Sequence, residues 1–156
     1  MRCSARACFF WICFLSIPFF AHALPKGFVY LDDVDPSIEV DLRYATQKNF
    51  VGKKVDGYKA PRAIMTTAAA AALKKVQDDL RKEGYGLKVM DAYRPQRAVN
   101  HFVRWGRDLQ DEKTKQEYFP REPKRELFRR GYISTRSGHS RGSTIDLTLV
   151  TREKPQ

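Results

Sequence analysis

The chain has 156 residues, of which 42% are hydrophobic and 30% are charged, and its formal net charge is +11. This length suits one domain with a single hydrophobic core. The basic residues are interleaved with acidic ones along the chain, which argues against a nucleic-acid partner. Cys3, Cys8 and Cys13 all lie near the N-terminus, so the remainder offers no thiolate for zinc binding or nucleophilic catalysis.

The N-terminal residues have the pattern of a Sec-type signal peptide. The opening is basic, residues 7–20 are almost wholly apolar, and residues 21–23 form an A-x-A cleavage site. We expect residues 1–23 to be removed on export to the periplasm, which leaves a domain over residues 24–156 with no stable membrane anchor. A transmembrane helix is the alternative, but the apolar run is shorter than the roughly 20 residues that a bilayer requires, and a proline interrupts it.

Two short strands are expected at the start of the exported domain. Residues 28–31 have strand character, and a turn follows at Asp35-Pro36-Ser37. Residues 38–44 alternate apolar and charged side chains, which is typical of a half-buried strand. The stretch over residues 45–61 contains glycines and several lysines, and it is expected to form a loop.

The clearest helical pattern covers residues 62–83, with Thr66 or Thr67 as a cap and Gly84 just past its end. Apolar residues recur there at helical spacing: Met65, Ala69, Ala72, Leu73, Val76 and Leu80.

The second half of the chain continues the mixed organisation. Residues 86–91 predict a strand, and a helix follows from Pro95 or Gln96 to about Asp108. Residues 110–125 are polar, charged and proline-containing, which indicates a surface excursion. With a final strand over residues 145–150, the sequence predicts a small single-domain α+β fold with a mostly antiparallel sheet and two main helices.

One candidate site is the run SGHSRGSTID over residues 137–146. Gly138 and Gly142 suit a tight loop around His139, and Asp146 opens the final strand. Imidazole nitrogen and carboxylate oxygen are both good zinc ligands, and a bent loop can bring positions seven apart to one point. On these two residues alone, a surface histidine in a polar turn and an aspartate at a strand end explain the pattern better.

The other candidate site is Asp91-Ala92-Tyr93-Arg94-Pro95, a sharp exit from a strand. A guanidinium held at such a turn can stabilise negative charge that develops on a carbonyl oxygen. A structural salt bridge between Asp91 and Arg94 explains the same residues equally well.

A series of motifs along residues 24–156 resembles the zinc D-alanyl-D-alanine dipeptidases of the vancomycin-resistance type, in peptidase family M15. The runs occur in the family's order with compatible spacing. They are Tyr44-Ala45-Thr46, Asn49-Phe50 with Gly52-Lys53, Val55-Asp56-Gly57-Tyr58, Tyr85-Gly86-Leu87, DAYRP with RAVN at residues 91–100, Gly131-Tyr132, SGHSRGS at residues 137–143 and IDLTL at residues 145–149.

The resemblance implies site residues and a cofactor. His139 and Asp146 would be ligands of one Zn²⁺ ion, and Arg94 would stabilise the transition state of D-alanyl-D-alanine hydrolysis. Tyr44 and Ser137 would help to bind the charged ends of the dipeptide. In the family, water activated by zinc is the nucleophile, and a glutamate is the general base.

The chain departs from the family pattern after residue 150. The family's general base and third zinc ligand lie in a Glu-x-Trp-His segment, and no such motif occurs here. His101 is expected to have a packing or surface role on its helix. We therefore expect a C-terminally truncated dipeptidase with impaired hydrolysis and with apolar residues such as Leu147 and Leu149 exposed.

Two other classes of function stay open at this point. A non-catalytic remnant could bind peptidoglycan peptides without cleaving them. A binder of nucleic acid or of envelope polymers would depend on net charge alone.

Overall fold

The computed structural model describes residues 24–152, so the predicted signal peptide lies outside the described residues. A three-stranded sheet has the order β2-β4-β5, and a separate pair joins β1 and β3. The β1–β3 and β4–β5 pairs are antiparallel, whereas β2 and β4 run parallel. The strands are β1 (Phe28–Tyr30), β2 (Glu39–Val40), β3 (Ile64–Thr66), β4 (Tyr85–Asp91) and β5 (Asp146–Thr151).

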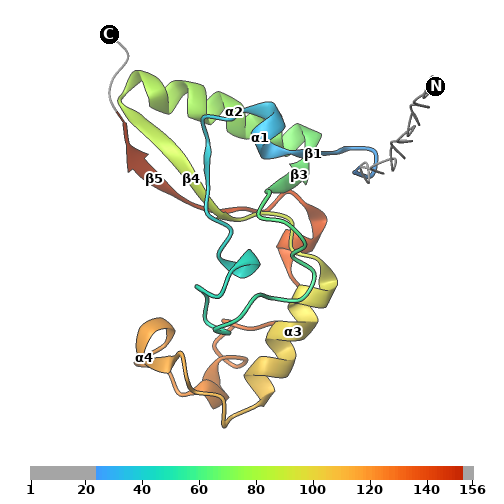
Figure 1. The fold of residues 1–156 in the computed structure, drawn as a ribbon, viewed down its shortest axis with the longest axis vertical. Coiled ribbons are helices and arrows are strands. Elements are labelled where there is room, and N and C mark those ends of the chain that lie inside the picture. The colour runs from blue at the N-terminus through green and yellow to red at the C-terminus, as the bar shows by residue number, and fades with distance from the viewer. Residues whose placement is uncertain (1–23, 153–156) are drawn as a thin grey trace, which may run out of the picture.

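Two long helices confirm the α+β fold with two main helices. Short helices are α1 (Leu31–Val34) and α4 (Lys115–Tyr118), and the long ones are α2 (Thr67–Lys82) and α3 (Gln96–Arg107). In Figure 1, α1, α2 and the strands form one half of the molecule, and α3 leads into the other half with α4. The turn between β4 and α3 connects the two halves.

Each half has its own hydrophobic core. The first lies between α2 and the sheet and includes Leu31, Met65, Leu73, Leu87 and Val89. The second surrounds α3 and includes Val51, Val55, Tyr58, Ala98, Phe102, Trp105, Phe119, Leu127 and Ile133.

The structure corrects the predicted boundaries at the N-terminal end. The strand predicted over residues 38–44 is only Glu39–Val40, because the chain turns into a 3₁₀ helix at Arg43–Ala45 that carries Tyr44 to the second core. The helix predicted over residues 62–83 begins at Thr67, after β3, which the apolar spacing did not reveal. Thr66 caps this helix by accepting the N–H of Ala69.

The buried face of α2 also differs from the predicted one. Val76 is 49% exposed, whereas Gln77 is fully buried. Gln77 accepts the backbone N–H of Leu87 at 2.8 Å and donates to the Ser37 hydroxyl at 3.0 Å. A buried amide with partners on two segments therefore joins α2 to β4 and to the turn before β2.

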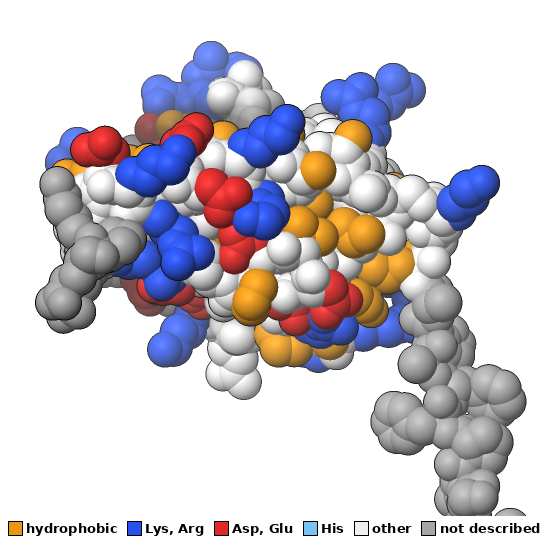
Figure 2. Space-filling model, turned by 90° about the horizontal axis from the view of Figure 1, so that it is seen from above, with side chains coloured by type: hydrophobic (Ala, Val, Ile, Leu, Met, Phe, Trp, Pro, Cys, Tyr) orange, Lys and Arg blue, Asp and Glu red, His pale blue; other side chains and the backbone are white. Residues whose placement is uncertain are grey.

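The basic and acidic side chains are dispersed over the surface, in agreement with their interleaving in the sequence. On the face shown in Figure 2, basic and acidic side chains are interspersed, with hydrophobic groups between them. Leu147 and Leu149 on β5 are 37% and 54% exposed, as expected from the sequence. No helix within residues 24–152 is long and apolar enough to span a bilayer.

We expect Gln77→Ala to lower the free energy of unfolding by about 1–3 kcal/mol, because it leaves the buried N–H of Leu87 without a partner. The exposed Lys75→Ala change on the same helix should alter it by less than about 0.5 kcal/mol. Urea denaturation of both variants measures the difference. Equal stability of the two variants would contradict the proposed bridging role of Gln77.

Candidate metal centre and active site

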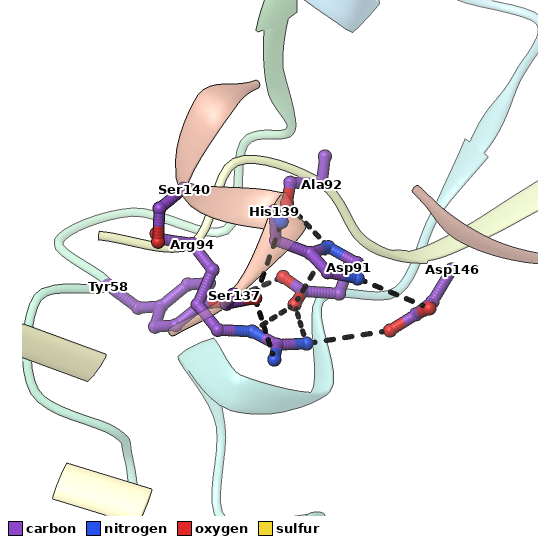
Figure 3. Close-up of polar contacts among 8 residues, drawn as sticks. All are labelled: Tyr58, Asp91, Ala92, Arg94, Ser137, His139, Ser140 and Asp146. Carbon is purple, nitrogen blue, oxygen red and sulfur yellow. Dashed lines mark hydrogen bonds and ion pairs between the residues drawn. The ribbon is translucent and has the colours of Figure 1, made fainter. Parts of the chain in front are cut away.

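The turn after β4 places Asp91 and Arg94 side by side (Figure 3). Asp91 is 1% exposed, and its Oδ2 accepts hydrogen bonds from Nε and Nη2 of Arg94 at 2.9 and 2.6 Å. Tyr58 donates its hydroxyl hydrogen to the other oxygen, Oδ1, at 2.7 Å. The buried carboxylate is thus satisfied on both oxygens, and it holds the guanidinium in one orientation.

The ionisation of these groups follows from their burial. Burial raises the pKa of Asp91, and the positive charge of Arg94 opposes that shift. Burial and the neighbouring carboxylate raise the pKa of Tyr58. Tyr58 therefore keeps its proton and remains a hydrogen-bond donor to Asp91 at neutral pH.

The 3₁₀ turn Gly138–Arg141 brings His139 to the same place. Ser137 caps this turn by accepting the backbone N–H of His139 at 3.3 Å. The turn ends at Gly142, which has a φ of +78°, and a Cβ there would lie 2.5 Å from the ring of Phe28. Glycine is required at this position for its conformation and for its lack of a side chain.

The His139 ring is oriented by a backbone carbonyl. Nδ1 donates to the oxygen of Ala92 at 2.9 Å, because a carbonyl can only accept. In the neutral ring Nε2 therefore carries the lone pair that metal binding requires. Nε2 faces Oδ1 of Asp146 at 3.4 Å.

Asp146 reaches this point because it is the first residue of β5. It lies opposite Asp91 in the register of β4 and β5, next to an irregularity in the pairing. Its Oδ2 is 3.6 Å from Nη2 of Arg94, and its side chain is half exposed. It lines an open cleft of about 610 Å³, which Tyr44 also lines.

The pair formed by His139 and Asp146 has the spacing of a zinc site. Two ligands of one tetrahedral zinc ion lie about 3.4 Å apart, given metal–ligand distances of roughly 2.0–2.2 Å. The observed separation of Nε2 and Oδ1 is 3.4 Å. A proton on Nε2, or a cation between the two atoms, would make this contact favourable. The pair therefore fits a metal ion without rearrangement.

Asp91 does not fit as a third ligand on the same ion. Within residues 24–152, Asp91, His139 and Asp146 are the one group of three potential ligands whose donor atoms lie within 4.8 Å of one another. However, Oδ2 of Asp91 lies 3.6 Å from Nδ1, the nitrogen that is bonded to Ala92, and both carboxylate oxygens of Asp91 already accept hydrogen bonds. We assign Asp91 the role of holding Arg94, so His139 and Asp146 are the two candidate ligands that converge among the described residues.

The remaining residues predicted from the sequence also lie here. Nη1 of Arg94 lies 3.5 Å from the Ser137 hydroxyl, to which it donates. The rings of Tyr44 and Phe102 are each centred 5.2 Å from the guanidinium carbon. Burial raises the pKa of Tyr44 to about 12. The structure thus brings all five predicted side chains together, and their roles stay predictions.

Sequence reasoning missed the residues that support the site. The structure is compatible with both roles considered for Arg94, a structural salt bridge and stabilisation of negative charge. The guanidinium is paired with Asp91, and it also lies 3.6 Å from Asp146. Tyr58 lies in one of the motif runs but had no predicted role, and its only local signal is the preceding Asp-Gly turn. His101 has the predicted packing role: it is 6% exposed on α3.

Comparison with known proteins identifies the family. A protein-family model described as D-ala-D-ala dipeptidase, Peptidase M15, matches residues 25–156. The chain belongs to this family. It is 48% identical over 122 residues to a D-alanyl-D-alanine dipeptidase of Streptomyces coelicolor and 46% identical over 126 residues to one of Enterococcus faecalis. A relative with the same description in Escherichia coli is 31% identical over 117 residues.

These alignments cover most of this chain but less of its relatives. The alignment with the Streptomyces coelicolor protein includes 78% of this chain and 60% of the relative. For the Enterococcus faecalis protein the shares are 81% and 62%, and for the Escherichia coli protein they are 73% and 49%. The chain therefore spans about three fifths of the length of the first two.

We expect Arg94→Leu to lower the free energy of unfolding by about 3–5 kcal/mol at pH 7, because it leaves the Asp91 carboxylate buried without a cation. The loss should shrink in acid, where Asp91 becomes protonated and neutral. Arg43→Leu is the control, since it breaks an exposed pair with Asp41 and should cost less than about 1 kcal/mol. Denaturant titrations at pH 7 and pH 4 test this, and a loss independent of pH would contradict it.

In metal-free protein the pKa of His139 should lie above its usual 6.5, because Asp146 accepts from and attracts the protonated ring. Protonation of His139 then stabilises the fold below pH 6.5, and this contribution is lost as the pH rises through the folded-state pKa. NMR titration of the ring Hε1 should show a lower midpoint in Asp146→Asn. The midpoint should stay unchanged in Asp79→Asn, an exposed site on α2. Identical midpoints in the unmodified protein and both variants would exclude the contact between His139 and Asp146.

Proposed function

We propose that this domain takes part in zinc-dependent hydrolysis of D-alanyl-D-alanine during turnover of cell-wall precursors. The observation that carries the proposal is the separation of 3.4 Å between Nε2 of His139 and Oδ1 of Asp146, beside a fixed guanidinium, in a chain of the dipeptidase family. The names of the relatives support the dipeptide as substrate. The signal-like residues 1–23 support a periplasmic location.

Separate residues of this chain would hold the metal ion and stabilise the transition state. When bound, zinc would act as a Lewis acid that activates water at neutral pH. His139 and Asp146 would hold the ion, and the hydrogen bond from Nδ1 to Ala92 fixes the tautomer for that purpose. Arg94 would donate to the oxyanion on the former peptide carbonyl, and it would need no reorganisation because Asp91 already orients it.

Substrate binding would use the cleft beside Asp146. Tyr44 lines it, and Ser137 lies within hydrogen-bond distance of Arg94. The family resemblance implies that both residues help to bind the charged ends of the dipeptide. A cleft of about 610 Å³ admits a molecule of that size.

Zinc titration by calorimetry tests the ligand assignment. Asp146→Ala should weaken zinc affinity by about tenfold or more, because one of two converging ligands is removed. Glu112→Gln, on the distant loop before α4, should leave it unchanged. Equal affinities would show that zinc binds elsewhere.

A chimera tests the activity. Residues 24–152 would replace the matching stretch of the Streptomyces coelicolor relative, and release of D-alanine from D-alanyl-D-alanine would be measured. We expect hydrolysis that falls about 10²- to 10³-fold in Arg94→Met, because the oxyanion loses its charged donor. A folded, zinc-loaded chimera whose rate ignores Arg94 would contradict this role.

A non-catalytic peptide-binding domain is the second candidate. It is favoured because, among the described residues, only His139 and Asp146 converge as candidate ligands, while Tyr58 and Arg94 already donate to both oxygens of Asp91. Dipeptide binding by the 156-residue chain that persists in a chelator, without release of D-alanine, would support this candidate. Measurable hydrolysis by the chain alone would exclude it.

A further inference from the structure

His101 lies on α3 outside the metal centre and joins that helix to a distant loop. Its Nδ1 accepts the backbone N–H of Asp56 at 3.0 Å. The same nitrogen lies 3.3 Å from Oδ1 of the Asp56 carboxylate. Arg104 donates to the other carboxylate oxygen at 2.6 Å and keeps this side chain beside the ring.

The two contacts of Nδ1 require opposite protonation states. The N–H of Asp56 can donate only to a neutral ring, in which Nδ1 carries a lone pair. A protonated ring places an N–H against an N–H, and it can donate only to the carboxylate. When the His101 ring is protonated, Nδ1 loses the backbone N–H of Asp56 as a partner and gains the Asp56 carboxylate. The backbone of Asp56 must then move away from the ring.

The backbone at Asp56 leads directly to the candidate site. Gly57 follows with a φ of +96°, and a Cβ there would lie 2.7 Å from Cγ of Pro95 and 2.5 Å from Cγ of Arg97. The turn is thus pressed against the start of α3, next to Arg94. Tyr58 comes next and donates to Asp91, the carboxylate that holds Arg94.

We propose that His101 is a positioning residue for the candidate site: its neutral ring anchors the Asp56–Tyr58 turn, and its protonation shifts that turn and weakens the hydrogen bond from Tyr58 to Asp91. Its meaning for catalysis rests on the function proposed above. The structural coupling itself does not depend on metal binding or on hydrolysis.

The surroundings of His101 lower its pKa, so its ring is protonated only below neutral pH. Burial lowers its pKa, and the nearby charges of Lys53 and Arg104 act in the same direction, whereas Asp56 opposes them. The folded state therefore favours the neutral ring. Its contribution to stability is complete above pH 6.5 and decreases as the pH falls below that value toward the folded-state pKa.

NMR of the ¹⁵N-labelled protein between pH 7.5 and pH 5 tests the coupling. The amide resonances of Gly57 and Tyr58 should follow the midpoint of His101, which should lie below 6.5. In His101→Asn this transition should disappear, because asparagine offers an acceptor near the place of Nδ1 but does not titrate. Amide shifts that persist in His101→Asn, or that follow His139, would overturn the proposal.

Asp56→Asn provides a second variant in case His101→Asn fails to fold. It keeps the backbone N–H but removes the carboxylate that would receive the protonated ring. The midpoint of His101 should fall by about half a pH unit or more. An unchanged midpoint would show that the carboxylate is not the alternative partner. Inactivity of the protein toward the dipeptide would leave both results interpretable.

Discussion

The buried pair of Asp91 and Arg94 is the interaction on which the site depends. A carboxylate that is 1% exposed is stable in the fold only because a guanidinium and a tyrosine hydroxyl satisfy both its oxygens. This requirement fixes the turn between β4 and α3, which also connects the two hydrophobic cores. The cationic side chain is therefore in place before any substrate binds.

The same turn specifies the position of the histidine. The N–H of Arg94 donates to the carbonyl of His139, and the Ser140 hydroxyl donates to the carbonyl of Arg94. The ring of His139 completes the connection by donating to Ala92. Two segments far apart in the sequence thus determine each other's geometry, and β5 adds Asp146 at the end of its pairing with β4. The site is a product of long-range packing.

The sequence predicts the long helices and strands, and the residues that converge at the candidate site, better than it predicts the residues that hold them in place. Helix α3 and strand β4 were found because their patterns are long and regular, whereas the strand predicted over residues 38–44 is cut short by contacts of Tyr44 in the second core. His139, Asp146 and Arg94 were candidates from their residue types and their turns, and the family resemblance added Tyr44 and Ser137. The roles of Gln77 and Tyr58 were not predicted, because they depend on hydrogen-bond partners in distant segments. The local spacing of apolar residues does not indicate such partners.

The proposed metal site consists of one ion bound between Nε2 of His139 and a carboxylate oxygen of Asp146. A crystal structure of the zinc-soaked protein, with anomalous data collected on both sides of the zinc edge, tests it most directly. We expect a zinc peak at roughly 2.0–2.2 Å from both atoms, with Nδ1 still bonded to Ala92. A peak on Nδ1, or occupied zinc only at other residues, would contradict it.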